Sequence, residues 1–173
     1  MISEKEILAG CIKGKQSAQW ELYSRYSRLL LAVCNRYAKD LDEAEDILQE
    51  GFVKIFLNIK RFKGDGPLLA WMRRIMVNTA ITHYHKTAKH RYHDDVSEVS
   101  ESKFEEKGWG ESDFTEEELF KIIQQMPDGY RQVFNLYAVE GYKHREIAEI
   151  LKIDENTSKS QYSRARRWLQ ERL

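Results

Sequence analysis

Apolar residues recur at three- and four-residue steps along most of this chain, which is the spacing of helices that bury one face. The run from Asp42 to Ile59 is the clearest example, with a predicted buried stripe of Ala44, Ile47, Leu48, Phe52, Ile55, Phe56 and Ile59. A second run, from Ser17 to Tyr37, places Leu22, Tyr26, Leu29, Leu30, Val33 and Tyr37 on one stripe. With only two prolines in 173 residues, the pattern predicts an all-α fold.

Start and stop signals for helices accompany this pattern. Ser3 with Glu6, and Thr115 with Glu118, have the spacing of capping boxes. Pro67 follows a glycine-rich turn and suits the first position of a helix that continues to about residue 86. After a stop at residues 126–127, the sequence predicts that Asp128 caps the next helix.

Apolar periodicity is lost over residues 87–114, which are rich in Ser, Glu and Asp and include two glycines. Such a composition is typical of a flexible linker, because it cannot bury enough apolar surface to fold. The sequence therefore predicts two small helical domains, residues 1–90 and 115–173, joined by an acidic flexible linker at 91–114.

Charge is distributed unevenly along the chain. The 28 Lys/Arg and 28 Asp/Glu balance overall. Residues 60–91 nevertheless carry eight Lys/Arg against one Asp, and residues 142–173 carry eight against five. Residues 92–141, between these two segments, carry four against thirteen. Two basic segments on either side of an acidic one predict two separate surfaces that bind a polyanion.

The last 32 residues have the pattern of a helix-turn-helix. A short helix with a buried face of Ile147, Ile150 and Leu151 is followed by a break at residues 152–153. Asp154 stands where it could cap a longer helix. That helix divides into an apolar side (Tyr162, Ala165, Trp168, Leu169, Leu173) and a polar, cationic side (Lys159, Ser160, Ser163, Arg164, Arg167). The pattern predicts a DNA-recognition helix; the alternative is an amphipathic helix whose basic face is only solvated.

The sequence gives little support for disulfide bonds, membrane insertion or metal binding. Cys11 and Cys34 lie inside helical patterns and read as small apolar residues in a reducing compartment. The chain has no apolar signal core and no apolar stretch of about 20 residues, so we expect a cytoplasmic protein without membrane insertion. Four histidines cluster between positions 83 and 93 (His83, His85, His90, His93), but without nearby cysteines we expect them to add positive charge rather than to bind a metal.

Three segments, in this order, resemble one protein family. Residues 44–54 (AEDILQEGFVK) resemble the conserved region 2 signature of bacterial sigma factors of the extracytoplasmic-function (ECF) group, in the sigma-70 family. Residues 71–80 (WMRRIMVNTA) look like the continuation of that region. Residues 127–173 are similar to region 4. The resemblance implies a region 2-like four-helix domain followed by a region 4-like helix-turn-helix domain.

The resemblance also implies partners. A sigma factor is a dissociable subunit that binds core RNA polymerase, recognises promoter DNA at the −35 and −10 elements and directs transcription initiation, and many are held inactive by an anti-sigma factor. By position, Asp46, Gln49 and Glu50 match the face that docks on the clamp helices of the polymerase. The alternative for these side chains is an ordinary solvated helix face.

The resemblance also implies which residues contact DNA. For the −10 element the candidates are Lys63, Asn78, Tyr84 and Lys86, whereas Trp71 is expected to be core. For the −35 element, family positions map onto Thr157, Lys159, Ser160, Ser163 and Arg164. Arg166 and Arg167 are expected to contact phosphate or solvent.

These features distinguish three classes of function. A promoter-specificity factor explains both basic segments and the acidic helix face. An autonomous helix-turn-helix repressor or activator is the alternative, and it would bind its operator without a polymerase, usually as a symmetric dimer. An enzyme is the weakest class, because no catalytic constellation, phosphate-binding glycine loop or metal-ligand spacing is evident. We therefore expect no catalytic residue, cofactor, metal or small-molecule substrate.

Overall fold

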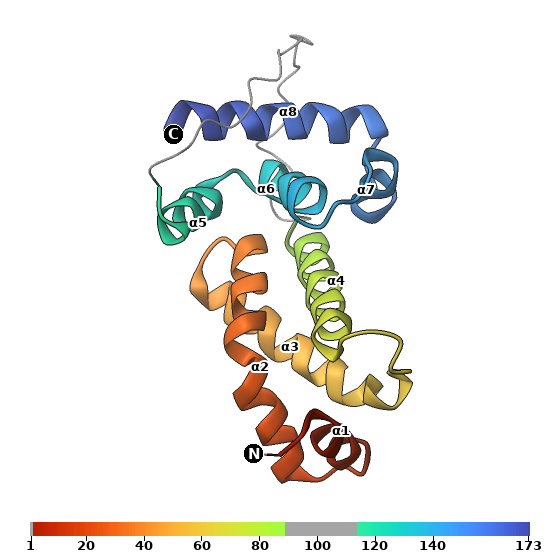
Figure 1. Cartoon of the computed structure of the whole chain (residues 1–173). Coiled ribbons are helices and arrows are strands. Elements are labelled where there is room, and N and C mark those ends of the chain that lie inside the picture. Colours follow the sequence, from red (N-terminus) through yellow and green to blue (C-terminus); the bar gives the residue numbers. More distant parts are fainter. Residues whose placement is uncertain (1, 89–113) are drawn as a thin grey trace. The chain divides into compact units, whose positions relative to one another are not determined.

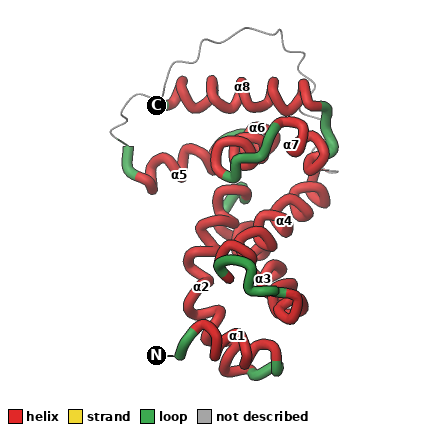
Figure 2. Tube along the Cα trace, turned by 45° about the vertical axis from the view of Figure 1, so that its right-hand side comes forward, coloured by secondary structure: helices red, strands yellow, loops and turns green. Residues whose placement is uncertain are grey.

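The computed structural model describes residues 2–88 and 114–173, and every regular element in these two ranges is a helix (Figure 2). The predicted all-α fold is confirmed. The chain divides into two compact units, Met1–His83 and Tyr84–Leu173, called here the N-terminal and C-terminal units. Nearly all of the predicted linker, 91–114, lies outside the described residues, as do His90 and His93. The predicted domain boundaries therefore stay a prediction.

The N-terminal unit is built around two long helices, α2 and α3 (Figure 1). Helix α1 packs against α2, which in turn packs along α3. The elements are α1 (Glu4–Ile12), α2 (Gln16–Tyr37), α3 (Leu41–Asn58), the 3-10 turn η1 (Ile59–Arg61) and α4 (Leu68–Ala88). The last residues of α4, from Tyr84 on, are counted in the C-terminal unit. The capping box predicted at the start of α1 is present: the backbone N–H of Glu6 donates to Ser3 Oγ, and that of Ser3 donates to the Glu6 carboxylate.

Helix α3 buries the stripe that its sequence predicts, apart from Phe56, which is half-buried. The prediction for α2 was wrong at one position, because Leu29 is 55 % exposed although Leu30 beside it is fully buried. The start of α4 was misplaced by one residue. Pro67 precedes the helix, and its carbonyl accepts the bond from the N–H of Trp71.

Gly51 of α3 leaves room for the side chain of Met76 of α4. A Cβ added at this residue would overlap the side chain of Met76, which is fully buried. The Cys34 thiol of α2 lies on the same methionine, with 3.8 Å between Sγ and Sδ. Burial raises the pKa of Cys34 to about 12, so its sulfur is a neutral thiol that packs as an apolar atom. Three helices thus meet at Met76.

Contact between α1 and α2 also depends on a glycine, Gly10. Its surroundings predict whether an alanine there raises or lowers the free energy of unfolding. In an open helix, Gly→Ala stabilises by up to about 1 kcal/mol. At Gly10 a new Cβ would overlap the Cβ of Ala18, which has no flexible end that could move away. We expect Gly10→Ala to lower the free energy of unfolding by about 1–3 kcal/mol, measured by urea denaturation. The double variant Gly10→Ala/Ala18→Gly should recover part of the loss, and a stabilised single variant would refute the close packing.

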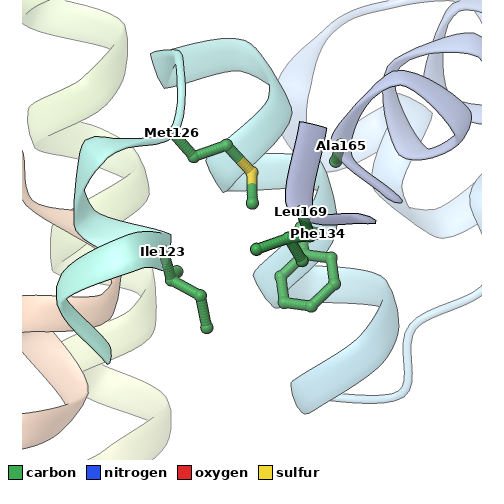
Figure 3. Packing of buried hydrophobic residues seen from close by; sticks show 5 residues of the cluster. All are labelled: Ile123, Met126, Phe134, Ala165 and Leu169. Atoms are coloured by element: carbon green, nitrogen blue, oxygen red, sulfur yellow. The ribbon is translucent and has the colours of Figure 1, made fainter. Parts of the chain in front are cut away.

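The C-terminal unit contains α5 (Glu116–Gln125), α6 (Asp128–Phe134), the π-helical turn η2 (Asn135–Val139), α7 (His144–Leu151) and α8 (Glu155–Arg172). Helices α6 and α7 both pack on α8. Figure 3 shows the side chains that converge in its core: Ile123, Met126, Phe134, Ala165 and Leu169. The capping box predicted at Thr115 is present. Leu173 is exposed, so its predicted place in the core was wrong.

A buried arginine joins α5 to α6. Arg131 is only 2 % exposed, and its Nη1 donates to the carbonyl oxygens of Gln124 (3.0 Å) and Met126 (2.8 Å). Its Nη2 donates to the Asp128 carboxylate. The predicted cap at Asp128 was therefore wrong: Pro127 occupies the N-cap position, and the aspartate pairs with the arginine instead.

Candidate functional site

Helix α3 presents an acidic outer face. Asp46, Gln49 and Glu50 are all exposed, whereas Ile47 and Leu48 between them are buried. Positions three and four apart lie on the same side of a helix, so the three polar side chains share one surface. Gln49 is also tied to the neighbouring helix, because its Nε2 donates to the Tyr23 hydroxyl at 3.4 Å. We call Asp46, Gln49 and Glu50 the acidic face.

A hollow between α2 and α3 borders the acidic face. Asp46 and Gln49 line it from α3, and Tyr23 and Leu31 line it from α2. Ser27, Arg28, Glu45 and Leu48 complete its lining. The hollow therefore has apolar walls and charged groups of both signs.

The second candidate site lies along α4. Asn78 is exposed and lines a hollow, here the α4 hollow, with Lys54, Asn58, Arg61, Trp71, Ile75 and Thr79. Two cations, two amides and an indole therefore surround one space. Trp71 is half-buried against Phe62, with ring centroids 5.5 Å apart, so it belongs partly to the core and partly to this wall. Sequence reasoning missed Lys54 and Asn58 of α3 and Arg61 of η1, because they reach Asn78 of α4 only through packing of the three elements.

The other three candidates for the −10 element do not line the α4 hollow. Lys63 is exposed in the loop before α4, and Lys86 is exposed on the last turn of that helix. Tyr84 is half-buried and lies six residues after Asn78, which places it about 120° round the helix axis from Asn78. The structure thus groups only Asn78 with the hollow.

The helix-turn-helix geometry is present in the C-terminal unit. Helix α7 ends at Leu151, and its C-cap residue Lys152 has a left-handed φ of 56°, which reverses the chain before α8. The N–H of Lys143 donates to the Glu146 carboxylate at 2.9 Å, which satisfies one amide at the start of α7. Asp154 is at the N-cap position of α8 as predicted, but its side chain makes no capping hydrogen bond.

The five candidates for the −35 element lie within the first ten residues of α8. Lys159 and Ser163 are exposed, and Thr157, Ser160 and Arg164 are half-buried on the flanks. Local bonds hold two of these side chains. Lys159 Nζ lies 3.7 Å from the Glu155 carboxylate, and Ser160 Oγ donates to the Asn156 carbonyl at 2.9 Å. The apolar side of the same helix contributes Ala165 and Leu169 to the core, so α8 has the two-sided build of a recognition helix.

A histidine joins α7 to α8 beside these residues. His144 Nδ1 lies 2.8 Å from Ser158 Oγ, and its ring stacks on Tyr137 with centroids 4.3 Å apart. Ser158 is fully buried. Burial lowers the pKa of His144, and the positive charge of Lys159 lowers it further, so the ring is neutral around pH 7. Sequence reasoning did not single out His144 or Ser158, because their pairing depends on how the two helices pack.

Among residues 2–88 and 114–173, no helix is both long enough and apolar enough to span a bilayer. The same residues contain no group of three or more Cys, His, Asp and Glu side chains placed to hold a metal ion.

Comparison with known families covers both units. Residues 22–90 match Sigma-70 region 2, and residues 116–169 match Sigma-70, region 4. Over 164 residues the chain is 30 % identical to the ECF RNA polymerase sigma-E factor of Escherichia coli (strain K12), covering 89 % of this chain and 85 % of that protein. It is 26 % identical over 174 residues to the RNA polymerase sigma-H factor of Pseudomonas aeruginosa, covering 94 % and 90 %.

A solved structure is also similar. It is a co-crystal structure of the sigma factor RpoE in complex with the anti-sigma factor NepR from Bartonella quintana. The TM-score is 0.49 at 22 % identity, over 87 % of this chain and 93 % of that chain. The family assignment rests on the sequence matches alone.

Proposed function

The chain belongs to the ECF group of the sigma-70 family, and from this premise we propose which of its surfaces perform each step of transcription initiation. As a sigma factor it binds core RNA polymerase, recognises promoter DNA and directs initiation. The assignment of residues to these steps is our proposal.

The acidic face of α3 docks on the clamp helices of the polymerase. The observation that carries this assignment is that Asp46, Gln49 and Glu50 are exposed together on the side of α3 opposite its buried stripe. Carboxylates on a rigid helix suit a partner with Lys or Arg, because complementary charge steers association and fixes register.

The α4 hollow receives an unpaired base of the −10 element. Asn78 can donate to and accept from a base edge, and the exposed part of Trp71 offers an aromatic face. Lys54 and Arg61, which also line the hollow, can bind the phosphates on either side of that base. Lys63, Tyr84 and Lys86 contact the strand outside the hollow in this proposal.

Helix α8 reads the −35 element. Lys159 and Ser163 are exposed where a recognition helix meets base edges, with Thr157, Ser160 and Arg164 beside them. The His144–Ser158 contact fixes α8 on α7, so these side chains are presented from a rigid support. We also propose that an anti-sigma factor regulates the protein; a pull-down from its native host that recovers no such partner would argue against this regulator.

Reconstituted transcription tests the proposal directly. The purified chain is mixed with core polymerase and a promoter library, and the expected result is initiation at a defined set of start sites only when both proteins are present. The competing function, an autonomous repressor or activator, predicts tight operator binding by the chain alone, as a symmetric dimer. Sequence-specific binding of that kind, without any polymerase-dependent transcript, would overturn the proposal.

Replacing Arg164 by Ala tests the −35 assignment. If the guanidinium reads a base through two hydrogen bonds, the variant should bind its promoter more weakly by about 1–3 kcal/mol and accept other bases at one position. Arg167→Ala is the matched control, because an exposed arginine on phosphate should weaken binding equally on all sequences. Binding of the polymerase complex to single-base promoter variants gives both results. Unchanged affinity and preference would remove Arg164 from the site.

A further inference from the structure

A histidine packs at the junction of η2, α7 and α8, beside the residues proposed to read the −35 element (Figure 1). His144 is the first residue of α7, and its ring stacks on Tyr137 of η2 with centroids 4.3 Å apart. Its Nδ1 lies 2.8 Å from Oγ of Ser158, which is fully buried on α8. Ser158 stands between Thr157 and Lys159, two of the −35 candidates. The charge of this ring therefore acts within one helical turn of side chains proposed to meet DNA.

Charged groups close to the ring favour its neutral form. Burial lowers the pKa of His144 most, the charge of Lys159 lowers it further, and the Glu155 carboxylate raises it. Lys159 Nζ lies 3.7 Å from that carboxylate, so the two charges partly offset each other. The titratable and charged residues packed against His144 or next to it in sequence come from all three elements: Tyr137 on η2, Lys143 and Arg145 on α7, and Glu155, Lys159 and Tyr162 on α8.

The starts of two helices also disfavour a positive ring. His144 occupies the first position of α7, and Ser158 completes the first turn of α8. The first turn of a helix carries a partial positive charge from its unpaired N–H groups, which repels cations and attracts anions. In the free chain the neutral imidazole is therefore preferred, and an anion brought to this end of α8 would reverse part of that preference.

Protonation is compatible with the contact between α7 and α8. A serine hydroxyl can donate or accept, and both ring nitrogens donate in the imidazolium. The charged ring can therefore donate from Nδ1 to Ser158 Oγ across the same 2.8 Å. A proton thus changes the charge beside Lys159 without releasing α8 from α7.

Duplex DNA supplies the anion. In the proposed function α8 lies in the major groove of the −35 element, and the duplex carries one negative charge for about every 1.7 Å of its length. That field offsets the charge of Lys159 and favours the imidazolium. We propose that His144 takes up a proton when the C-terminal unit binds the −35 element, so that this chain recognises its promoter more tightly as pH falls. The inference rests on the −35 role proposed for α8 and adds pH as a determinant of promoter recognition.

A ratio of two affinities isolates this effect. One DNA fragment carries both elements of a promoter selected in the reconstituted assay, and the other carries a replaced −35 element, so contributions from the −10 element and the polymerase cancel. For the full chain with core polymerase, the ratio should increase about three- to tenfold between about pH 8 and pH 5.5, because each unit by which DNA raises the pKa of His144 multiplies the affinity by about ten. The increase should level off once the ring is protonated in the free chain as well.

Two substitutions separate the charge of the ring from its packing. His144→Gln keeps a polar group for Ser158 but does not titrate, so its ratio should match the wild type at about pH 8 and stay constant as pH falls. His144→Arg is permanently charged, so its ratio should already be high at that pH. His83→Gln is the matched control: this half-buried histidine belongs to the N-terminal unit, and its replacement should leave the pH dependence of the ratio unchanged.

Folding of the free chain gives a readout of opposite sign. Because the pKa of His144 is lower in the folded chain than in the unfolded chain, the unfolded chain binds the proton more readily. This contribution to stability is complete above the ordinary pKa of histidine and is lost as pH falls below it. His144→Gln should therefore lose less stability than the wild type in urea denaturation between about pH 7.5 and pH 5.5. Equal losses would remove the preference for the neutral ring and overturn the inference.

The binding results distinguish the inference from the function on which it rests. If the ratio of His144→Gln rises in acid as steeply as that of the wild type, another group takes up the proton and the inference is overturned. A ratio lowered equally at every pH would give His144 a purely structural role and would overturn it as well. A wild-type complex that binds both fragments equally at every pH would instead remove −35 recognition from α8, and with it the proposed assignment.

Discussion

Replacing Arg131 by methionine should lower the free energy of unfolding of the C-terminal unit by about 3–5 kcal/mol, because one partner of a buried charge-assisted network is lost. Its guanidinium donates to two carbonyl oxygens and to the Asp128 carboxylate. Methionine fills a similar volume but donates nothing, so the three acceptors lose their partner beneath α6. The junction between α5 and α6 would have to open to water.

Denaturant unfolding of the full chain, followed by circular dichroism, measures this effect. Arg145→Met is the matched control, since Arg145 is exposed on α7 and its replacement should change stability by less than about 0.5 kcal/mol. If Arg131→Met unfolds like the wild type, the buried network contributes nothing to the stability of the unit. The α6–α8 packing would then have to hold the junction by itself.

Reversing the charge of the acidic face should have the largest effect on function. In Asp46→Arg/Glu50→Arg, two cations replace the two carboxylates that are proposed to meet basic side chains on the polymerase. Like charges placed together at an interface cost several kcal/mol, so binding to core polymerase should fall by more than about 100-fold at low salt. Fluorescence titration of labelled core polymerase measures the affinity, and transcription from a cognate promoter should be lost in parallel.

The control for this variant must carry the same change in net charge. Glu149→Arg/Glu171→Arg does so at two exposed positions on α7 and α8, which belong to the C-terminal unit. It should bind core polymerase as the wild type does. Equal losses in both variants would trace the effect to overall charge, and no loss in either would remove the acidic face from the docking site.

Local sequence determined which parts of the fold could be predicted. Apart from Phe56, the stripe of α3 was predicted correctly because its apolar positions repeat over five turns, and both capping boxes need only residues three apart. Leu29 was misassigned because an apolar residue next to a buried one fits the period equally well. Only the packing of neighbouring helices decides which of the two is covered. Arg131 was missed because a charged residue is normally expected at the surface.

The candidate sites show the same difference between residues grouped by one helix and residues grouped by packing. Asp46, Gln49 and Glu50 share one helix, and so do the polar positions of α8, so their grouping follows from period alone. The α4 hollow combines α3, η1 and α4, and the His144–Ser158 contact combines two helices. Neither could be predicted, because residues far apart in sequence come together only after the helices pack.

The neutral thiol packed against Met76 determines how the protein can be labelled. With a pKa of about 12, Cys34 is a thiolate in only about one molecule in 10⁵ at pH 7. Cys11 is buried as well, and burial raises its pKa. Maleimide reagents attack the thiolate, so both native cysteines should react slowly while the chain is folded. A cysteine introduced on an exposed turn can therefore carry a fluorophore in the otherwise native sequence, and motions during promoter opening can be followed without a cysteine-free background.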